Sequence, residues 1–111
     1  MTNEELNTRL YEKMFEEQGT YRGWLLSQPP EEILNHTYEY TMREDILISM
    51  ECDDLSDKQC RALLKSPCPL GDVYKEWEKR ETGHMDDIRD TLESRANAVI
   101  RQDFLKSQAE R

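Results

Sequence analysis

Both histidines of the chain have carboxylates nearby at helical spacing, a pattern that can hold a divalent metal ion. Glu32, His36 and Glu39 would share one face of a helix, and His84 and Asp87 would share another. A di-iron bundle requires a Glu-x-x-His motif on each of two helices, and the residue three before His36 is isoleucine. We therefore expect structural or solvent-facing histidines and no bound metal, with a weak metal site as the alternative.

Cysteine chemistry is the next possibility, since Cys68 and His84 could in principle form a nucleophile and base. The chain has no glycine-rich turn that would build an oxyanion hole, and the only candidate phosphate loop, at Gly71, has an acid beside it. The three cysteines, Cys52, Cys60 and Cys68, are spaced eight apart, which fits neither a disulfide framework nor a zinc knuckle. We expect a protein that is not an enzyme and carries no cofactor.

The strongest chemical feature is a concentration of negative charge between residues 31 and 54. This acidic segment carries seven of the nine net negative charges, and its only base is Arg43. Such a field repels nucleic acid and anionic membranes and attracts basic surfaces. A solubilising surface is the plain alternative. The carboxylates that we predict to bind a partner are Glu31, Glu32, Glu39, Glu44, Asp45, Glu51, Asp53 and Asp54.

Tyr38 and Tyr40 lie within the acidic segment and could serve as anchors for a partner, because tyrosine combines a large apolar body with a hydrogen-bonding tip. Their helical spacing is equally compatible with a place in the core.

Direct binding of nucleic acid is not expected. The most basic stretch contains five bases, but interspersed acids leave it with a net charge of only plus one. Its bases are Arg89, Arg95, Arg101, Lys106 and Arg111. The chain also lacks an apolar run of the roughly 20 residues that a membrane span needs, and its first residues do not resemble a secretory signal. We expect a cytoplasmic protein.

The composition predicts an all-α protein that forms one domain over residues 1–111. Only four glycines and four prolines occur among abundant Glu, Lys, Arg, Leu and Met. Capping boxes at Thr2 and Ser56, together with prolines at helix starts, mark the boundaries. The expected helices cover about residues 3–26, 30–52, 57–65 and 69–106.

These helices should form a small bundle of three long helices and one short one. Residues 30–52 carry apolar side chains on two sides, so this helix should be central. The long last helix would extend beyond the core and invite a homodimer or another partner. Gly19 could weaken the first helix, and two helices meeting at Thr82-Gly83 are the alternative to one long last helix.

The stretch from Tyr21 to Asp45, which includes Trp-Leu-Leu-Ser-Gln-Pro-Pro-Glu-Glu-Ile-Leu-Asn-His, resembles a family of small acidic proteins of gut Firmicutes. The likeness continues through residues 63–69 and 78–83. Members of that family are often carried on conjugative elements and prophages, and the family has no established activity. The resemblance implies cargo of a mobile element, a setting in which small proteins opposing host defence are common.

Size, local acidity and that implied setting predict an inhibitor of the anti-CRISPR type. Its carboxylates would compete with guide RNA or DNA for a basic channel of a nuclease such as Cas9. The alternative is a helical adaptor or structural protein that acts through helix–helix contact or dimerisation of the last helix.

Overall fold

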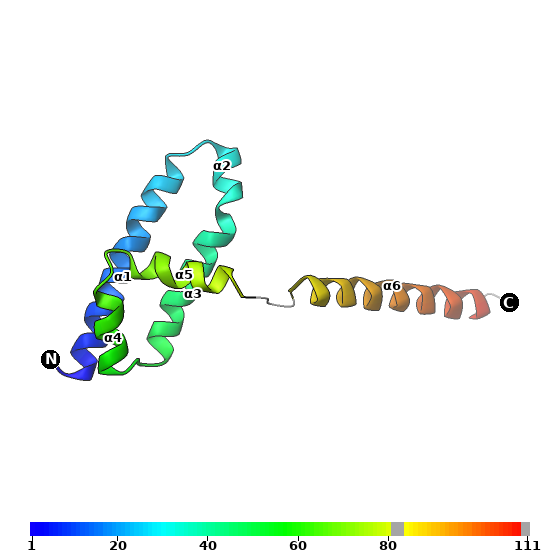
Figure 1. Cartoon of the computed structure of the whole chain (residues 1–111). Helices are drawn as coiled ribbons and strands as arrows, with labels where there is room; N and C mark the ends of the chain where they lie inside the picture. Colours follow the sequence, from blue (N-terminus) through cyan, green and yellow to red (C-terminus); the bar gives the residue numbers. More distant parts are fainter. Residues whose placement is uncertain (81–83, 110–111) are drawn as a thin grey trace. The chain divides into compact units, whose positions relative to one another are not determined.

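The computed structural model describes residues 1–80 and 84–109, which form six α-helices and no strand (Figure 1). The all-α class is therefore confirmed. The chain divides into two compact units, Met1–Lys79 and Arg80–Arg111, called here the N-terminal and C-terminal units. The helices are α1 (Asn3–Leu26), α2 (Pro30–Asn35), α3 (Thr37–Cys52), α4 (Asp57–Leu64), α5 (Pro69–Glu78) and α6 (His84–Ala109).

Helix α1 has the predicted bounds and continues through Gly19. Its N-terminus is capped as expected, because the Thr2 hydroxyl accepts a hydrogen bond from the Glu5 backbone N–H at 3.1 Å. Leu6, Leu10 and Met14 recur every four residues and form its buried side. The helix is long enough to run beside every other helix of the N-terminal unit.

The predicted continuous helix over residues 30–52 is wrong, because the chain breaks at His36 between α2 and α3. His36 has φ −109° and ψ 5°, outside the helical range. The Thr37 hydroxyl donates to the Ile33 carbonyl at 2.8 Å, which uses the acceptor that an uninterrupted helix would offer to the Thr37 N–H. The His36 ring packs edge-on against Trp24 of α1, with ring centroids 5.2 Å apart. A contact with a distant segment thus holds the break.

Helix α4 confirms the second capping box. The Ser56 side chain accepts from the Gln59 N–H, and the Gln59 side chain accepts from the Ser56 N–H. The helix ends at Leu64, shortly before Pro67.

The single helix predicted over residues 69–106 is also wrong. Helix α5 ends at Glu78, and Lys79 and Arg80 form a turn. Glu78, Lys79 and Arg80 are all charged, so no apolar packing supports a continuation of the helix there. The alternative break at Thr82-Gly83 lies outside the described residues. Helix α6 extends to Ala109, three residues beyond the predicted end.

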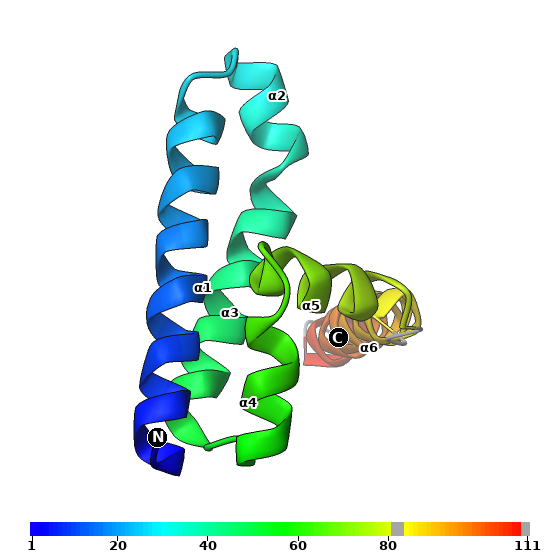
Figure 2. The same ribbon diagram turned by 60° about the vertical axis from the view of Figure 1, so that its left-hand side comes forward.

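The core of the N-terminal unit forms where α1 meets α3, α4 and α5. Leu6, Leu10 and Met14 of α1 pack with Leu47 of α3, Cys60 of α4 and Leu70 of α5. Helix α3 packs between α1 and α5, as a helix with two apolar sides should. The central element is nevertheless α1, which contacts each of the other four helices of this unit (Figure 2). The expected bundle of three long helices and one short one is replaced by this five-helix unit and the separate α6.

Polar side chains of α1 form hydrogen bonds with backbone groups at the ends of α4 and α5. These backbone groups have no partner within their own helices. Asn7 holds Leu55 from both sides, donating to its carbonyl and accepting from its N–H, each at 2.9 Å. The Lys13 ammonium donates to the carbonyls of Leu64 and Ser66, at 3.0 and 2.6 Å. Because buried backbone groups must be hydrogen-bonded, these contacts position α4 and the chain that follows it.

Candidate functional site

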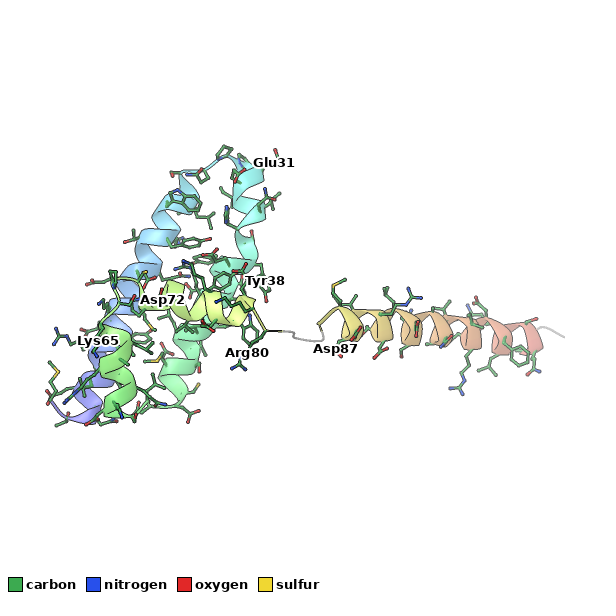
Figure 3. All side chains as sticks on the ribbon, in the orientation of Figure 1. Glu31, Tyr38, Lys65, Asp72, Arg80 and Asp87 are labelled. Atoms are coloured by element: carbon green, nitrogen blue, oxygen red, sulfur yellow. The ribbon has the colours of Figure 1, made fainter. Side chains whose placement is uncertain are left out.

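The acidic segment runs along α2, α3 and the connection to α4. Glu31 and Glu32 lie in the first turn of α2, where the helix dipole favours anions. Figure 3 shows Glu31 at the start of α2. Four of the predicted carboxylates lie on α3, and Asp53 and Asp54 follow it. The six that are exposed to solvent are Glu31, Glu32, Asp45, Glu51, Asp53 and Asp54.

The remaining two, Glu39 and Glu44, are half-buried and bonded within the protein. A Glu39 carboxylate oxygen accepts from Arg43 Nε at 2.9 Å, and Glu44 accepts from the Gln18 side chain at 3.0 Å. The exposed Glu51 also has an internal partner, because it accepts from the Tyr11 hydroxyl at 2.6 Å. This hydrogen bond raises the pKa of Tyr11 above its usual value. Sequence reasoning missed these internal roles.

The carboxylates of α3 do not share one face. At 100° per residue, Glu44 and Glu51 lie on one side of the helix, while Glu39 and Asp45 point in two other directions roughly 120° away. Glu31 and Glu32 lie together in the first turn of α2. Glu51, near the end of α3, is followed closely along the chain by Asp53 and Asp54. The structure does not gather all eight predicted residues into a single patch.

Arg43, the only base of the acidic segment, is enclosed. Its side chain is 11% exposed and pairs with Glu39 of α3 and, at 3.6 Å, with Glu17 of α1. The guanidinium also lies over the ring of Tyr21, 4.2 Å from the centroid, in a cation–π contact. Burial is the main cause that raises the pKa of Tyr21, and the same holds for Tyr74 of α5. The one positive charge of the segment therefore stabilises the junction of helices and is withdrawn from the surface.

Glu17 completes this junction by capping α5. Its two carboxylate oxygens accept from the backbone N–H groups of Leu70 and Gly71, at 2.9 and 2.8 Å. Pro69 occupies the first turn, where a missing N–H costs nothing. A carboxylate at a helix N-terminus also interacts favourably with the helix dipole. The backbone of Gly71 approaches this junction closely: a Cβ there would make tight contacts, 3.2 Å from Glu17 Oε2 and 3.3 Å from Arg43 Nη2.

We expect Gly71→Ala to lower the free energy of unfolding by about 1–2 kcal/mol, because the new methyl group displaces the Glu17 cap and the Arg43 pair. The control is Gly23→Ala in α1, where nothing lies within 4 Å of the added Cβ. That change should stabilise the protein by about 0.5–1 kcal/mol through helix propensity. Urea denaturation followed by tryptophan fluorescence measures both. Stabilisation by both variants would contradict the close approach at Gly71.

Aromatic side chains are exposed near the start of α3. Tyr38 is 55% exposed and accepts a hydrogen bond from the Trp77 indole N–H of α5 at 3.2 Å. Figure 3 labels Tyr38 on α3 near the end of α5. Trp77 is itself 38% exposed, whereas Tyr40 is half-buried. Of the two predicted anchors, Tyr38 is the accessible one, with Trp77 beside it.

The structure shows no metal-binding cluster among the residues that it describes. No group of three His, Cys, Asp or Glu side chains there could hold a metal ion. His36 lies 3.7 Å from Glu32, but Glu39 is bonded to Arg43. Cys52 and Cys68 are exposed free thiols and Cys60 is buried. The side chain of His84 lies outside the description, so its predicted neighbours Asp87 and Cys68 are not tested as partners.

Helix α6 is the one helix in the described part of the C-terminal unit, and most of its large apolar side chains are exposed. Its exposed apolar side chains recur at three- and four-residue spacing, whereas Arg89, Arg95, Arg101 and Lys106 point in several directions. Arg89 pairs with Glu93 at 2.9 Å. The exposed apolar residues are Met85, Ile88, Leu92, Val99, Ile100, Phe104 and Leu105.

Fold and surface together define an all-α acidic protein with a compact five-helix unit and a second unit that contains α6. None of its described helices has the length and apolar character required to cross a lipid bilayer. The chain belongs to the family described as "Protein of unknown function (DUF3848)", whose model matches residues 6–100. No curated protein and no solved structure matches the chain. The predicted membership of a family without a known activity is thereby confirmed.

Proposed function

We propose that this protein is a non-enzymatic inhibitor that docks its acidic segment on a basic, nucleic-acid-binding surface of another protein. The observation that supports this most is the enclosure of Arg43. Among residues 1–80 and 84–109, no Lys or Arg lies within ion-pair distance of Glu31, Asp45, Asp53 or Asp54. The segment therefore presents carboxylates outward with no exposed base between them.

The charge of the whole N-terminal unit acts in the same direction. Residues 1–79 contain 17 acids and 9 bases, a net charge of −8, and the rest of the chain is close to neutral with a net charge of −1. Such a field raises the rate at which a basic partner is met and excludes nucleic acid as a competitor for this surface. Tyr38 and Trp77 would supply apolar contact beside the carboxylates, since aromatic residues dominate the energetics of many interfaces.

The sharpest form of the proposal is an anti-CRISPR protein carried by a mobile element. The partner is then a nuclease such as Cas9, whose guide and DNA channel is lined by Lys and Arg. Carboxylates along α2, α3 and the connection to α4 would occupy sites that phosphates normally fill. Occupation of the channel would block engagement of guide RNA or DNA.

Four substitutions test this mechanism: Glu31→Gln, Asp45→Asn, Asp53→Asn and Asp54→Asn in one variant. Glu39 and Glu44 are left intact because they are bonded internally, so folding is spared. We expect affinity for purified, guide-free Cas9 to fall at least about tenfold, and wild-type affinity to weaken with added salt. Calorimetric titration at low and high salt measures both.

A matched variant carries four neutralised acids outside the acidic segment: Glu12→Gln, Glu16→Gln, Asp87→Asn and Asp90→Asn. Equal loss in the two variants would mean that net charge, and not this surface, attracts the partner. Affinity that is the same at low and high salt would contradict electrostatic docking altogether.

A second candidate is an adaptor that binds through α6, and the exposed apolar side chains of that helix favour it. An adaptor of this kind should bind its partner normally when the four carboxylates are neutralised. It should lose binding when Ile88 is replaced by aspartate, whereas the electrostatic inhibitor should tolerate that change.

A further inference from the structure

We infer that α6 pairs with α6 of a second copy in an antiparallel arrangement centred on Ala96. Most helical stability in proteins comes from packing of an apolar face, and a helix without such packing is marginal in water. Seven large apolar side chains of α6 are at least 38% exposed, and all of them except Leu105 lie within about 80° of the Ala96 direction. The order of residues along that face indicates which surface covers it.

Four of the apolar residues of α6 are placed symmetrically about Ala96. Leu92 and Ile100 lie four residues before and after it, and Ile88 and Phe104 lie eight residues before and after. In an antiparallel pair aligned on Ala96, Leu92 of each copy meets Ile100 of the other, whereas Ile88 and Phe104 lie at the same level on the two flanks of the interface, about 80° from the Ala96 direction. Ala96 itself, small and exposed, allows the two helix axes to approach closely at the centre.

Charge follows the same symmetry. Arg89 lies seven residues before Ala96 and Asp103 seven residues after, each within about 20° of the Ala96 direction. Antiparallel pairing therefore places Arg89 of one copy against Asp103 of the other, twice per dimer. A parallel pair in register would instead place Arg89 against Arg89 and Asp103 against Asp103. Like charges within an interface are unfavourable, so charge selects the antiparallel arrangement.

Within its own chain, Arg89 already pairs with Glu93, and both side chains are largely exposed, at 72% and 57%. An exposed pair of this kind contributes little stability. The Arg89 guanidinium is therefore free to exchange this partner for Asp103 of the second copy. This pairing of two copies is independent of the proposed function, because it involves no partner other than a second copy of the chain.

The test is a charge-swap series on the full chain, measured by sedimentation equilibrium. We expect the wild type to show a concentration-dependent dimer. Arg89→Glu and Asp103→Arg should each weaken the dimer about tenfold, because each creates two like-charge contacts. The double variant should return to within about threefold of the wild type. Arg101→Glu makes the same charge change as Arg89→Glu on a side of α6 away from Ala96 and should have no effect.

Three results would overturn the inference. One is a monomer at every accessible concentration. The apolar side chains of α6 would then pack against the N-terminal unit or an unrelated protein. The second is a dimer that ignores both single changes, as a parallel pair or another interface would. The third is a double variant as weak as the single ones. None of these results bears on binding of a basic partner, and failure of that binding leaves the dimer test intact.

Discussion

Truncation of Leu10 to alanine should lower the free energy of unfolding of the N-terminal unit by about 2–5 kcal/mol. Leu10 is fully buried and lies in the middle of the α1 row that contacts the other helices. Its loss removes favourable transfer of apolar surface and leaves a cavity that neighbours on three other helices cannot fill. For a domain of this size, such a loss is a large part of the total stability.

Both tryptophans, Trp24 and Trp77, belong to the N-terminal unit, so fluorescence during urea denaturation reports on this unit without interference from α6. The control is Leu26→Ala in the same helix, where the side chain is 60% exposed. It should change stability by less than about 0.5 kcal/mol. Similar effects of the two variants would mean that the core does not centre on α1.

Replacement of Arg43 by alanine is the second change with a large expected effect, a loss of about 3–5 kcal/mol. The side chains of Glu17 and Glu39 are only 16% and 25% exposed, so both carboxylates would be left partly buried without a counter-charge. The stacking on Tyr21 would be lost as well. Because Glu17 also caps α5, the damage should extend to the attachment of that helix.

A combined variant identifies the cause. Arg43→Met together with Glu39→Gln removes the charge and one of its carboxylate partners, and should recover part of the loss. Arg22→Ala on the exposed side of α1 is the matched control and should be nearly neutral. If Arg43→Ala proved as mild as Arg22→Ala, the enclosed ion pairs would not hold the helices together, and the support for an all-carboxylate surface would weaken with them.

Local signals in the sequence predicted much of the fold. The capping signals at Thr2 and Ser56 located the starts of α1 and α4, because a cap is made by residues three positions apart, although only Ser56 forms the complete reciprocal box. The breaks at His36 and after Glu78 were missed for different reasons. The break at His36 involves contact with Trp24, twelve residues away, which local sequence does not reveal. The break after Glu78 falls where apolar residues are absent, but the apolar positions before and after it are in phase, so the pattern suggested one continuous helix.

The acidic segment was found from composition, but the separate roles of its members were not. Glu39 and Arg43 are four residues apart, a spacing that could have indicated an internal pair. The partner Glu17 could not have been found this way, because it is 26 residues away on another helix. The symmetry of α6 around Ala96 is readable from spacing alone, yet it gains meaning only once α6 is seen as a separate helix.

The polar contacts made by α1 have a consequence for the time course of folding. Lys13 and Glu17 reach residues 51 to 54 positions further along the chain, distances that are unusual for helical proteins, where neighbours in sequence are usually neighbours in space. Closing such long loops slows the search for the native state. During synthesis, α1 is made before the helices that enclose it, and its enclosure is incomplete until Leu70 of α5 has been translated. Part of the apolar side of α1 therefore stays uncovered in the nascent chain until α5 is made, a period in which binding by a chaperone would matter most.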